Sequence, residues 1–356
     1  MNAILLEDCC EILDNLRVPI TASERKSGPY PYYGANGVQD YVNEYIFDDE
    51  LVLLAEDGGN FGSKTRPIAY RVSGKCWVNN HAHVLKPKPG LDVDFLCYSL
   101  MFYKTDGLVN GATRQKLTQA TMRKMLIPDM TLDNQRIVVD KLNKVLAIKS
   151  KREKQLIKLD ELIKARFVEM FGNPVANEKG WNVDLCKNLT TKIGSGATPK
   201  GGKESYLTKG ISLIRSLNVH NNQFVYDDLA CISKEQAEKL NNVIIQQGDV
   251  LLNITGASVA RCCIVPNSVL PARVNQHVSI IRCNEKLLPV FVSCMFTDDN
   301  FQQFLLNVAT GGGATREAIT KEEIEKFVLI TPPIERQKQF VDFVEQVDKS
   351  KFVNAP

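Results

Sequence analysis

The tetrapeptide Gly111-Ala112-Thr113-Arg114 occurs a second time as Gly313-Ala314-Thr315-Arg316, 202 positions further along the chain. The match continues in register without a gap, so that Gln135 corresponds to Gln337. Solenoid repeats have periods of about 20–50 residues, and this period is far longer. The repeat therefore indicates a duplicated domain.

Two further blocks repeat upstream in the same order. Val52–Gly58 corresponds to Val250–Gly256 at an offset of 198, and Val78-Asn79-Asn80-His81 resembles Val274-Asn275-Gln276-His277 at an offset of 196. Loop insertions make an offset drift by a few residues in this way. Two similar units in one chain can mimic a two-fold dimer, and two-fold proteins suit partners that have two half-sites.

Composition restricts the class of protein. The 356 residues allow two or three domains, and 44% hydrophobic with 24% charged residues is ordinary for a globular protein. No apolar run approaches the roughly 20 residues of a membrane span, and the N-terminus has no basic segment, so we expect a cytoplasmic protein without a signal peptide. Ten Cys without a C-x-x-C, and only four His, predict reduced core thiols rather than a metal site.

One long helix is predicted over residues 133–172, because this stretch lacks Pro and Gly before Gly172. A helix of about 40 residues is roughly 60 Å long and needs a partner helix. Residues 334–353 repeat its first half and are expected to pack antiparallel on it. A heptad-like seam with a polar middle is predicted along the long helix at Val138, Leu142, Val145, Lys149, Arg152, Leu156, Leu159, Ile163, Arg166 and Met170.

The expected fold class is therefore α+β. Two similar β-rich domains with short helices, residues 1–132 and 175–333, are separated by a coiled-coil spacer at 133–174 in a pseudo-two-fold arrangement. A short C-terminal helix at 334–356 packs on the spacer. β-branched runs between turn residues predict strands, and a capped apolar stretch predicts a helix; the predicted strands are 45–47, 51–55, 68–72, 76–78, 250–252 and 278–281, and the predicted helices are 94–103 and 118–125.

Catalytic motifs are missing from the sequence. Gly58–Thr65 resembles a phosphate-binding loop, but Ser63 intrudes before Lys64 and the glycine spacing is short. This loop is either a hairpin turn or a DNA-phosphate contact through Lys64 and Arg66. The only Pro-Pro, at Thr331–Ile334, lacks the acid or amide and the aromatic residue of an adenine methyltransferase, and no dinucleotide-binding Gly-x-Gly-x-x-Gly follows a strand. We therefore expect no active site.

Several loops carry residue types typical of nucleic-acid binding. Arg and Lys neutralise phosphates, Tyr hydroxyls and Gly N–H groups bond phosphate oxygens, and Asn can pair with an adenine edge. Glycine-rich turns that only connect strands are the alternative. The Gly-Ala-Thr-Arg loops either touch DNA or brace each unit against the spacer, and bracing is favoured because both copies directly precede a helical segment. The Asn-x-His segments can equally fix a buried turn. The candidate DNA-binding residues are Arg25, Lys26, Tyr30, Tyr32, Tyr33, Asn36, Asn60, Lys64, Arg66, Asn80, His81 and Arg114 in the first repeat, and Ser195, Thr198, Lys200, Lys203, Arg215, Asn218, Ser258, Arg261, Gln276 and Arg316 in the second.

The spacer is basic. Between Lys141 and Arg166 there are nine Lys and Arg against Glu153, Asp160 and Glu161. Such a bias is common on a solvated helix face, and it also suits a helix that passes near a DNA backbone.

Five segments together resemble one family, the DNA-specificity subunit of type I restriction–modification systems. They are Gly28–Gly37, Leu53–Gly58, Trp77–Val84, Leu159–Gly172 and Lys192–Pro199. The resemblance covers nearly the whole chain, although the family usually continues for about 20 residues beyond the point, near Val353, where the second helix ends here.

The resemblance implies two target-recognition domains, each of which reads one half of a bipartite double-stranded DNA site. The helices would act as a ruler and as the dock for two modification subunits. Those partners would carry S-adenosylmethionine and perform adenine N6 methylation, and restriction subunits would use ATP and Mg²⁺. This chain itself would hold no cofactor or metal. A helical adaptor that binds only proteins is the alternative hypothesis.

Overall fold

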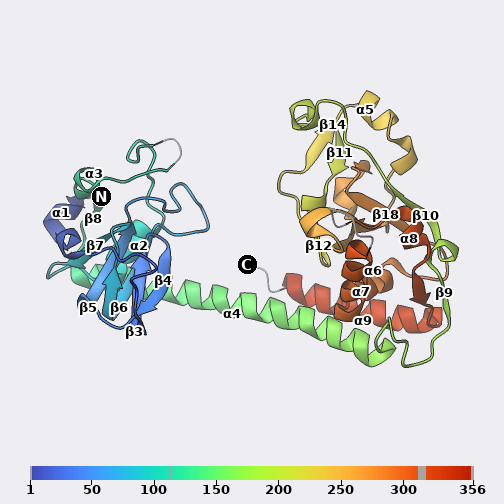
Figure 1. Ribbon diagram of the computed structural model, residues 1–356, viewed down its shortest axis with the longest axis horizontal. Helices are drawn as coiled ribbons and strands as arrows, with labels where there is room; N and C mark the ends of the chain where they lie inside the picture. The colour runs from blue at the N-terminus through green and yellow to red at the C-terminus, as the bar shows by residue number, and fades with distance from the viewer. Residues whose placement is uncertain (1, 112–113, 312–317, 354–356) are drawn as a thin grey trace. The chain divides into compact units, whose positions relative to one another are not determined.

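The computed structural model describes residues 2–111, 114–311 and 318–353, with the side chains of residues 352 and 353 left out. The chain divides into two compact units, Met1–Arg152 and Glu153–Pro356 (Figure 1). The division falls inside the long helix α4 (Leu132–Phe171), so each unit contains part of that helix. The domain boundaries expected from the sequence instead assign this helix to a segment of its own, residues 133–174, and these boundaries stay a prediction.

The first unit is built on one six-stranded sheet with the strand order β2-β7-β5-β6-β3-β4, and a small pair of strands, β1 and β8, lies beside it. Helix α2 packs on β5 and β6 (Figure 1). The elements are β1 (Ala3–Leu5), α1 (Leu6–Cys9), β2 (Cys10–Ile12), β3 (Ser27–Gly34), β4 (Gly37–Val42), β5 (Phe47–Ala55), β6 (Ala69–Val78), β7 (Ala82–Pro87), α2 (Val93–Met101), α3 (Gln119–Arg123) and β8 (Leu126–Pro128).

The second unit distributes its strands over several smaller sheets, with the orders β10-β18-β15-β16, β14-β11-β17, β12-β13 and β19-β9. Its elements are β9 (Val183–Leu185), β10 (Thr190–Ser195), β11 (Ile211–Ile214), β12 (Val219–His220), β13 (Gln223–Phe224), β14 (Ala230–Ile232), α5 (Lys234–Glu238), β15 (Val250–Asn253), β16 (Cys262–Ile264), β17 (Ala272–Val274), β18 (Val278–Cys283), α6 (Pro289–Phe296), α7 (Asp299–Thr310), α8 (Lys321–Glu325), β19 (Val328–Ile330) and α9 (Ile334–Val353).

The duplicated strand has the same burial pattern in both units. In β5, Val52 and Leu54 enter one apolar cluster and Leu53 enters the cluster on the opposite face. In β15, Val250 and Leu252 likewise enter one cluster while Leu251 enters another. Side chains alternate across a strand, so a continuous apolar run is buried on both faces of its sheet. The α+β class and the predicted strands at these positions are confirmed.

A repeated glutamine fixes the start of each long helix to its unit. Gln135 donates from Nε2 to the carbonyls of Gly90 and Met130 at 3.0 and 2.8 Å. Gln337, 202 positions later, donates to the carbonyls of Lys286 and Pro332 at 2.9 Å each. Both amides also accept a backbone N–H, at 2.8 Å from Asp92 and 2.9 Å from Leu288. These buried bonds satisfy groups that would otherwise destabilise the fold.

Helix α9 packs antiparallel on the part of α4 that belongs to the second unit. The Phe340 ring lies 5.5 Å from the rings of Phe167 and Phe171 near the end of α4. Eleven residues later along α9, Lys351 Nζ lies 2.7 Å from Asp160 Oδ1, eleven residues before Phe171 on α4. The prediction of one long helix with an antiparallel partner is confirmed for this part.

The predicted heptad seam is wrong in detail. The buried residues follow a spacing of four, Ile163, Phe167 and Phe171, and not the predicted sequence Ile163, Arg166, Met170. Upstream, Leu142 and Val145 are exposed. Residues four apart lie on one face of a straight helix, so three large side chains at this spacing form the contact stripe.

Among the described residues, no helix combines the length and the low charge that a bilayer span requires.

Candidate nucleic-acid interface

The three repeated sequence blocks meet at one point of the first unit. The Glu56 N–H donates to the carbonyl of His81 at 2.9 Å, which joins the block after β5 to the Asn-x-His block. The Leu117 N–H donates to the carbonyl of Glu56 at 2.7 Å, and Asp57 forms a β-bridge with Lys116. These bonds place the segment after the Gly-Ala-Thr-Arg block beside the other two.

The second unit repeats the same bonds. The Ile254 N–H donates to the carbonyl of His277 at 3.0 Å, and the Ile319 N–H donates to the carbonyl of Ile254 at 2.8 Å. Thr255 forms the β-bridge with Ala318. Each bonded residue of the second unit is the repeat counterpart of the residue that makes the same bond in the first unit. The duplication therefore repeats the contacts as well as the residues.

A buried asparagine shapes the Asn-x-His turn in both units. Asn79 is 3% exposed and its Oδ1 accepts the N–H of His81 at 2.8 Å. Asn275 is 4% exposed and accepts the N–H of His277 at 3.0 Å. Asparagine commonly bonds the backbone two residues ahead in this way, and the bond fixes the turn. The structural interpretation of these two asparagines is therefore supported.

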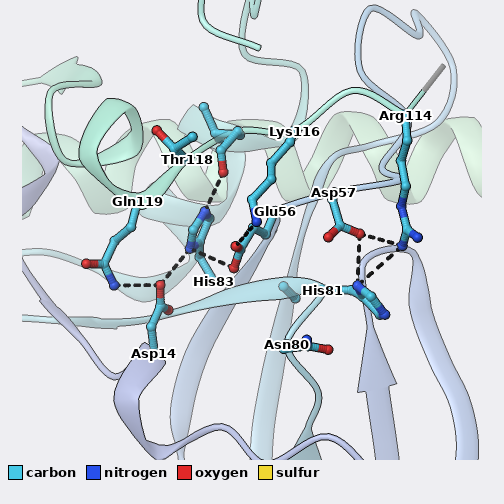
Figure 2. A network of polar contacts seen from close by, with 12 residues as sticks. Asp14, Glu56, Asp57, Asn80, His81, His83, Arg114, Lys116, Thr118 and Gln119 are labelled. Carbon is cyan, nitrogen blue, oxygen red and sulfur yellow. Dashed lines mark hydrogen bonds and ion pairs between the residues drawn. The ribbon is translucent and has the colours of Figure 1, made fainter. Parts of the chain in front are cut away.

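At the surface of the first unit, three side chains meet above this turn (Figure 2). Asp57 Oδ1 lies 2.8 Å from His81 Nδ1 and 2.5 Å from Arg114 Nη2. Asn36 reaches the same loop and donates from Nδ2 to the carbonyl of Gly58 at 3.0 Å. The side chain of Arg114 is 60% exposed, so the ion pair with Asp57 holds a cation at the surface.

The equivalent surface of the second unit is polar without the carboxylate. Thr255 replaces Asp57, and its Oγ1 lies 2.5 Å from His277 Nδ1. Gln276 Nε2 lies 3.1 Å from His277 Nε2, and the hydroxyl of Thr198 donates to Gln276 Oε1. A hollow of about 330 Å³ adjoins these groups and is lined by Ser216, Thr255, Gly256, Ala257, Ser258, Arg261 and His277.

An ionic cluster with a buried centre lies beside the surface group of the first unit (Figure 2). His83 is fully buried, with Nδ1 at 2.6 Å from Asp14 Oδ2 and Nε2 at 2.9 Å from the carbonyl of Leu117. Both ring nitrogens thus lie within hydrogen-bonding distance of an oxygen atom, as buried polar groups generally do. Asp14 also accepts hydrogen bonds from the Val84 N–H at 2.9 Å and from Gln119 Nε2 at 2.8 Å.

Glu56 completes the cluster. Its carboxylate lies 2.6 Å from Arg17 Nη1 and 3.0 Å from Lys116 Nζ. Burial raises the pKa of Asp14, but its hydrogen bond from His83 and its other contacts outweigh burial and hold the pKa below the ordinary value. Burial likewise raises the pKa of Glu56, and the bonds from Arg17 and Lys116 bring that pKa below the ordinary value.

Asp14, Glu56 and His83 are also, across the described residues, the one grouping whose ligand atoms lie close enough to hold a metal ion. Arg17 already occupies the position of a cation between them, because its guanidinium lies 2.6 Å from Glu56 and 3.5 Å from Asp14. Lys116 adds a second positive charge. We therefore assign the grouping as an ion-pair cluster that supports the surface turn.

This cluster predicts a dependence of stability on pH. A carboxylate whose pKa is lower in the folded state stabilises the fold above its unfolded pKa, here 3.8 for Asp14 and 4.5 for Glu56. That contribution is lost as the pH falls through the lower, folded pKa. The free energy of unfolding of the first unit should thus decline below about pH 5, and less steeply in Asp14→Asn. Urea unfolding between pH 3 and 7 measures this free energy. If it falls equally steeply with decreasing pH in the unmodified protein and in Asp14→Asn, the assignment is contradicted.

The ionic cluster has no copy at the matching positions of the second unit. Ile254 stands where the first unit has Glu56, Ser279 stands in place of His83, and Ala318 in place of Lys116. The two units therefore share the backbone frame of the site and differ in the charges around it.

Most of the sequence-predicted DNA-binding residues are at least partly accessible, and the structure gathers some of them. Asn36, Asn80, His81 and Arg114 lie around Asp57 in the first unit, whereas Thr198, Ser258, Arg261 and Gln276 lie around His277 in the second. The loop residues Lys26, Asn60, Lys64, Arg66, Ser195, Lys200 and Lys203 are exposed or half-buried, and no bond joins them to either group. Arg316 lies outside the described residues, as do residues 112–113 and the rest of the second Gly-Ala-Thr-Arg copy.

Other predicted residues have structural partners. Arg25 lies over the ring of Tyr32 and pairs with Asp40, and Arg215 lies over the ring of Tyr206. The Tyr30 and Tyr33 rings pack against those of Tyr45 and Tyr70.

Two predictions are corrected by burial. Tyr32 is 1% exposed, and its hydroxyl accepts the Ile20 N–H at 3.0 Å. Asn218 is fully buried, and its Nδ2 donates to the carbonyl of Val225 at 2.9 Å. Side chains that are enclosed and bonded in this way hold loops together and present nothing to a DNA groove.

The sequence reasoning missed Asp57, Thr255 and the ionic cluster. The sequence did point to Asp57 and Thr255, because they directly precede the repeated Gly58 and Gly256. No sequence pattern pointed to Arg17 and Asp14, since they lie about 40 residues before Glu56 in a stretch without a repeat.

Comparisons with known proteins agree on one family. The family model for the type I restriction modification DNA specificity domain matches residues 2–159 and 179–354. A putative type I restriction enzyme specificity subunit of Haemophilus influenzae is 39% identical over 145 residues, which are 41% of this chain and 37% of that protein. The EcoKI specificity subunit of Escherichia coli K12 is 21% identical over 326 residues, which are 84% of this chain and 68% of that protein.

Solved structures show the same fold. The type I restriction-modification S subunit of M. genitalium has a TM-score of 0.55 at 11% identity, covering 98% of this chain and 90% of that one. A chain from a structure of type I restriction–modification complex assembly has a TM-score of 0.53 at 14% identity, with the same coverage. The match to the Haemophilus relative spans only about a third of that protein's length. With the family model matching nearly all of its residues in two stretches, the chain belongs to the type I restriction–modification DNA specificity family.

Proposed function

We propose that this chain reads a bipartite double-stranded DNA site, with one half-site for each unit. The repeated contact set carries the proposal. Two copies of one backbone frame hold chemically different side chains at matching positions of the repeat: Asp57 and Asn80 in one unit, and Thr255 and Gln276 in the other. A protein that reads two unrelated half-sites requires this combination of a constant backbone and variable polar groups.

The chemistry of these surfaces suits DNA. Amide side chains can pair with base edges, and exposed cations neutralise phosphates and fix the register of a protein on the duplex. Lys64 and Arg66 are exposed on the loop after β5, and Lys200 and Lys203 are exposed on the loop after β10. These basic loops would supply the phosphate contacts for each unit.

The proposed role is that of a non-catalytic subunit. The sequence lacks the adenine methyltransferase and dinucleotide motifs, and family membership supports work within a larger complex. Two modification subunits would bring S-adenosylmethionine and methylate adenine N6 at the site chosen by this chain, and restriction subunits would bring ATP and Mg²⁺. The helices α4 and α9 are the proposed docking elements.

An exchange of units tests the proposal. Residues 1–131 would be replaced by the matching segment of a relative, in a host that carries the chain with its modification subunits, and methylated adenines would be mapped across the genome. We expect one half of the recognised sequence to change and the other to persist. The reciprocal exchange of 175–331 should change the other half. If neither exchange alters the methylated sequence, the chain acts only as a protein adaptor.

A further inference from the structure

We propose that Asn80 and Gln276 are the base-reading side chains of the two units, and that each recognises an adenine in its half-site. This inference rests on the proposed function. The two residues occupy the same position of the repeat, 196 residues apart, between the buried asparagine and the histidine of the turn. Both are exposed, whereas their neighbours on the N-terminal side are buried.

The backbone on both sides of each amide is fixed. Asn79 donates its N–H to the carbonyl of Tyr33 at 3.0 Å and its Nδ2 to Gln39 Oε1 at 3.0 Å. Asn275 donates its N–H to the carbonyl of Ile214 at 3.1 Å. The following histidines are held by the asparagine Oδ1 atoms. These bonds fix the backbone from which each amide projects, and such preorganisation of the backbone favours specific contact.

Gln276 keeps the hydrogen-bonding groups that adenine needs. Its Nε2 can only donate, so His277 Nε2 accepts that bond and His277 Nδ1 donates to Thr255. The Oε1 atom accepts from Thr198. One N–H of Nε2 and one lone pair of Oε1 are therefore still available to bind a base. An amide with one donor and one acceptor matches adenine N7 and N6–H in the major groove.

Asn80 has the same chemistry in a charged setting. Its side-chain amide makes no hydrogen bond to the described residues, and Figure 2 shows it beside His81 without a dashed contact. His81 in turn contacts the paired Asp57 and Arg114 (Figure 2). Arg114 can hold a phosphate while the amide meets the base, because half or more of protein–DNA bonds go to the backbone.

The test is a map of methylated adenines in a host that carries the full-length chain and its modification subunits. Asn80→Ala should relax the requirement for adenine at one position of one half-site, and Gln276→Ala at one position of the other. A lost bidentate pair reduces discrimination by about 5- to 150-fold. Asn43→Ala and Asn242→Ala, which remove exposed amides away from the turns, should leave both half-sites unchanged.

A second pair of variants gives a result that misfolding cannot produce. Asn80→Asp and Gln276→Glu keep the size of the side chain but remove its donors, and a carboxylate accepts from cytosine N4. We expect new methylation at sites where cytosine replaces the adenine in the affected half. If all four variants keep the original adenine requirement while exchange of residues 1–131 still changes a half-site, this inference fails and the proposed function stands. Relaxation at many positions of both half-sites would also overturn it.

Discussion

Replacement of Asp14 with alanine is expected to lower the free energy of unfolding of the first unit by about 3–5 kcal/mol, the usual effect of removing one partner from a buried ion pair. The carboxylate accepts bonds from His83, from Gln119 and from the Val84 N–H; His83 and Val84 are buried and Gln119 is half-buried. Without Asp14 these donors lose their acceptor, and the other carboxylate near His83, that of Glu56, lies 3.7 Å from Nδ1. A buried donor left unsatisfied destabilises a protein more than the bond itself stabilises it.

The two tryptophans of the chain allow the measurement within the full-length protein, because Trp77 lies in the first unit and Trp181 in the second. In a Trp181→Phe background, urea unfolding followed by fluorescence reports the first unit through Trp77. Asp106→Ala is the matched control, since Asp106 is exposed and makes no bond that the structure records among the described residues. A loss below about 1 kcal/mol for Asp14→Ala would show that the cluster is solvated and worth no more than a surface pair.

Much of the site frame was predictable from the repeats alone. The three blocks have different offsets, yet each block keeps its own contacts: Glu56 to His81 becomes Ile254 to His277, and Leu117 to Glu56 becomes Ile319 to Ile254. Backbone bonds do not depend on which side chain is present, so a duplicated frame survives changes of residue type. The same reason explains why the strands around Leu53 and Leu251 were predicted correctly.

Side-chain roles were harder to predict, because they depend on neighbours that are distant in sequence. Tyr32 was proposed as a DNA contact on its residue type, but β3 turns it into the unit, where Ile20 bonds its hydroxyl. Asn218 was proposed on the same ground, and it closes a loop through Val225. Arg17 pairs with Glu56 across 39 positions, and no local pattern announces such a pair.

The helix register shows a third kind of error. A heptad seam was expected, and the polar residues Lys149 and Arg152 were accepted as its weak middle. The contact stripe of the second unit instead uses Ile163, Phe167 and Phe171 at a spacing of four. A coiled coil has its register set by one partner helix, whereas here α6 also packs against α4 through Phe291, so a wider face is buried.

This wider face leads to the second large effect. Phe340→Ala in α9 is expected to destabilise the second unit by about 3–5 kcal/mol, the usual cost of truncating a buried phenylalanine. The Phe340 ring is fully buried and meets Phe167 and Phe171 edge to face at 5.5 Å. Phe291 packs on the same two rings, so the cavity would be walled by aromatic groups that two helices hold in place and that cannot easily close over it.

In a Trp77→Phe background, Trp181 reports this unit, and its ring lies 6.2 Å from that of Phe171. Phe343→Ala is the matched control on the same helix, because Phe343 is only half-buried and its ring packs against Arg166 at the edge of the interface.

Hydrogen exchange along residues 334–351 would then distinguish two responses of the second unit to Phe340→Ala. Faster exchange confined to α9 would mean that the helix detaches while the unit stays folded. Faster exchange throughout the unit would mean that α9 is part of its core, which is the outcome we expect from the continuous apolar cluster that joins Phe340 and Val344 to β15 and α6. Equal losses of stability in the two variants would contradict the central position of Phe340.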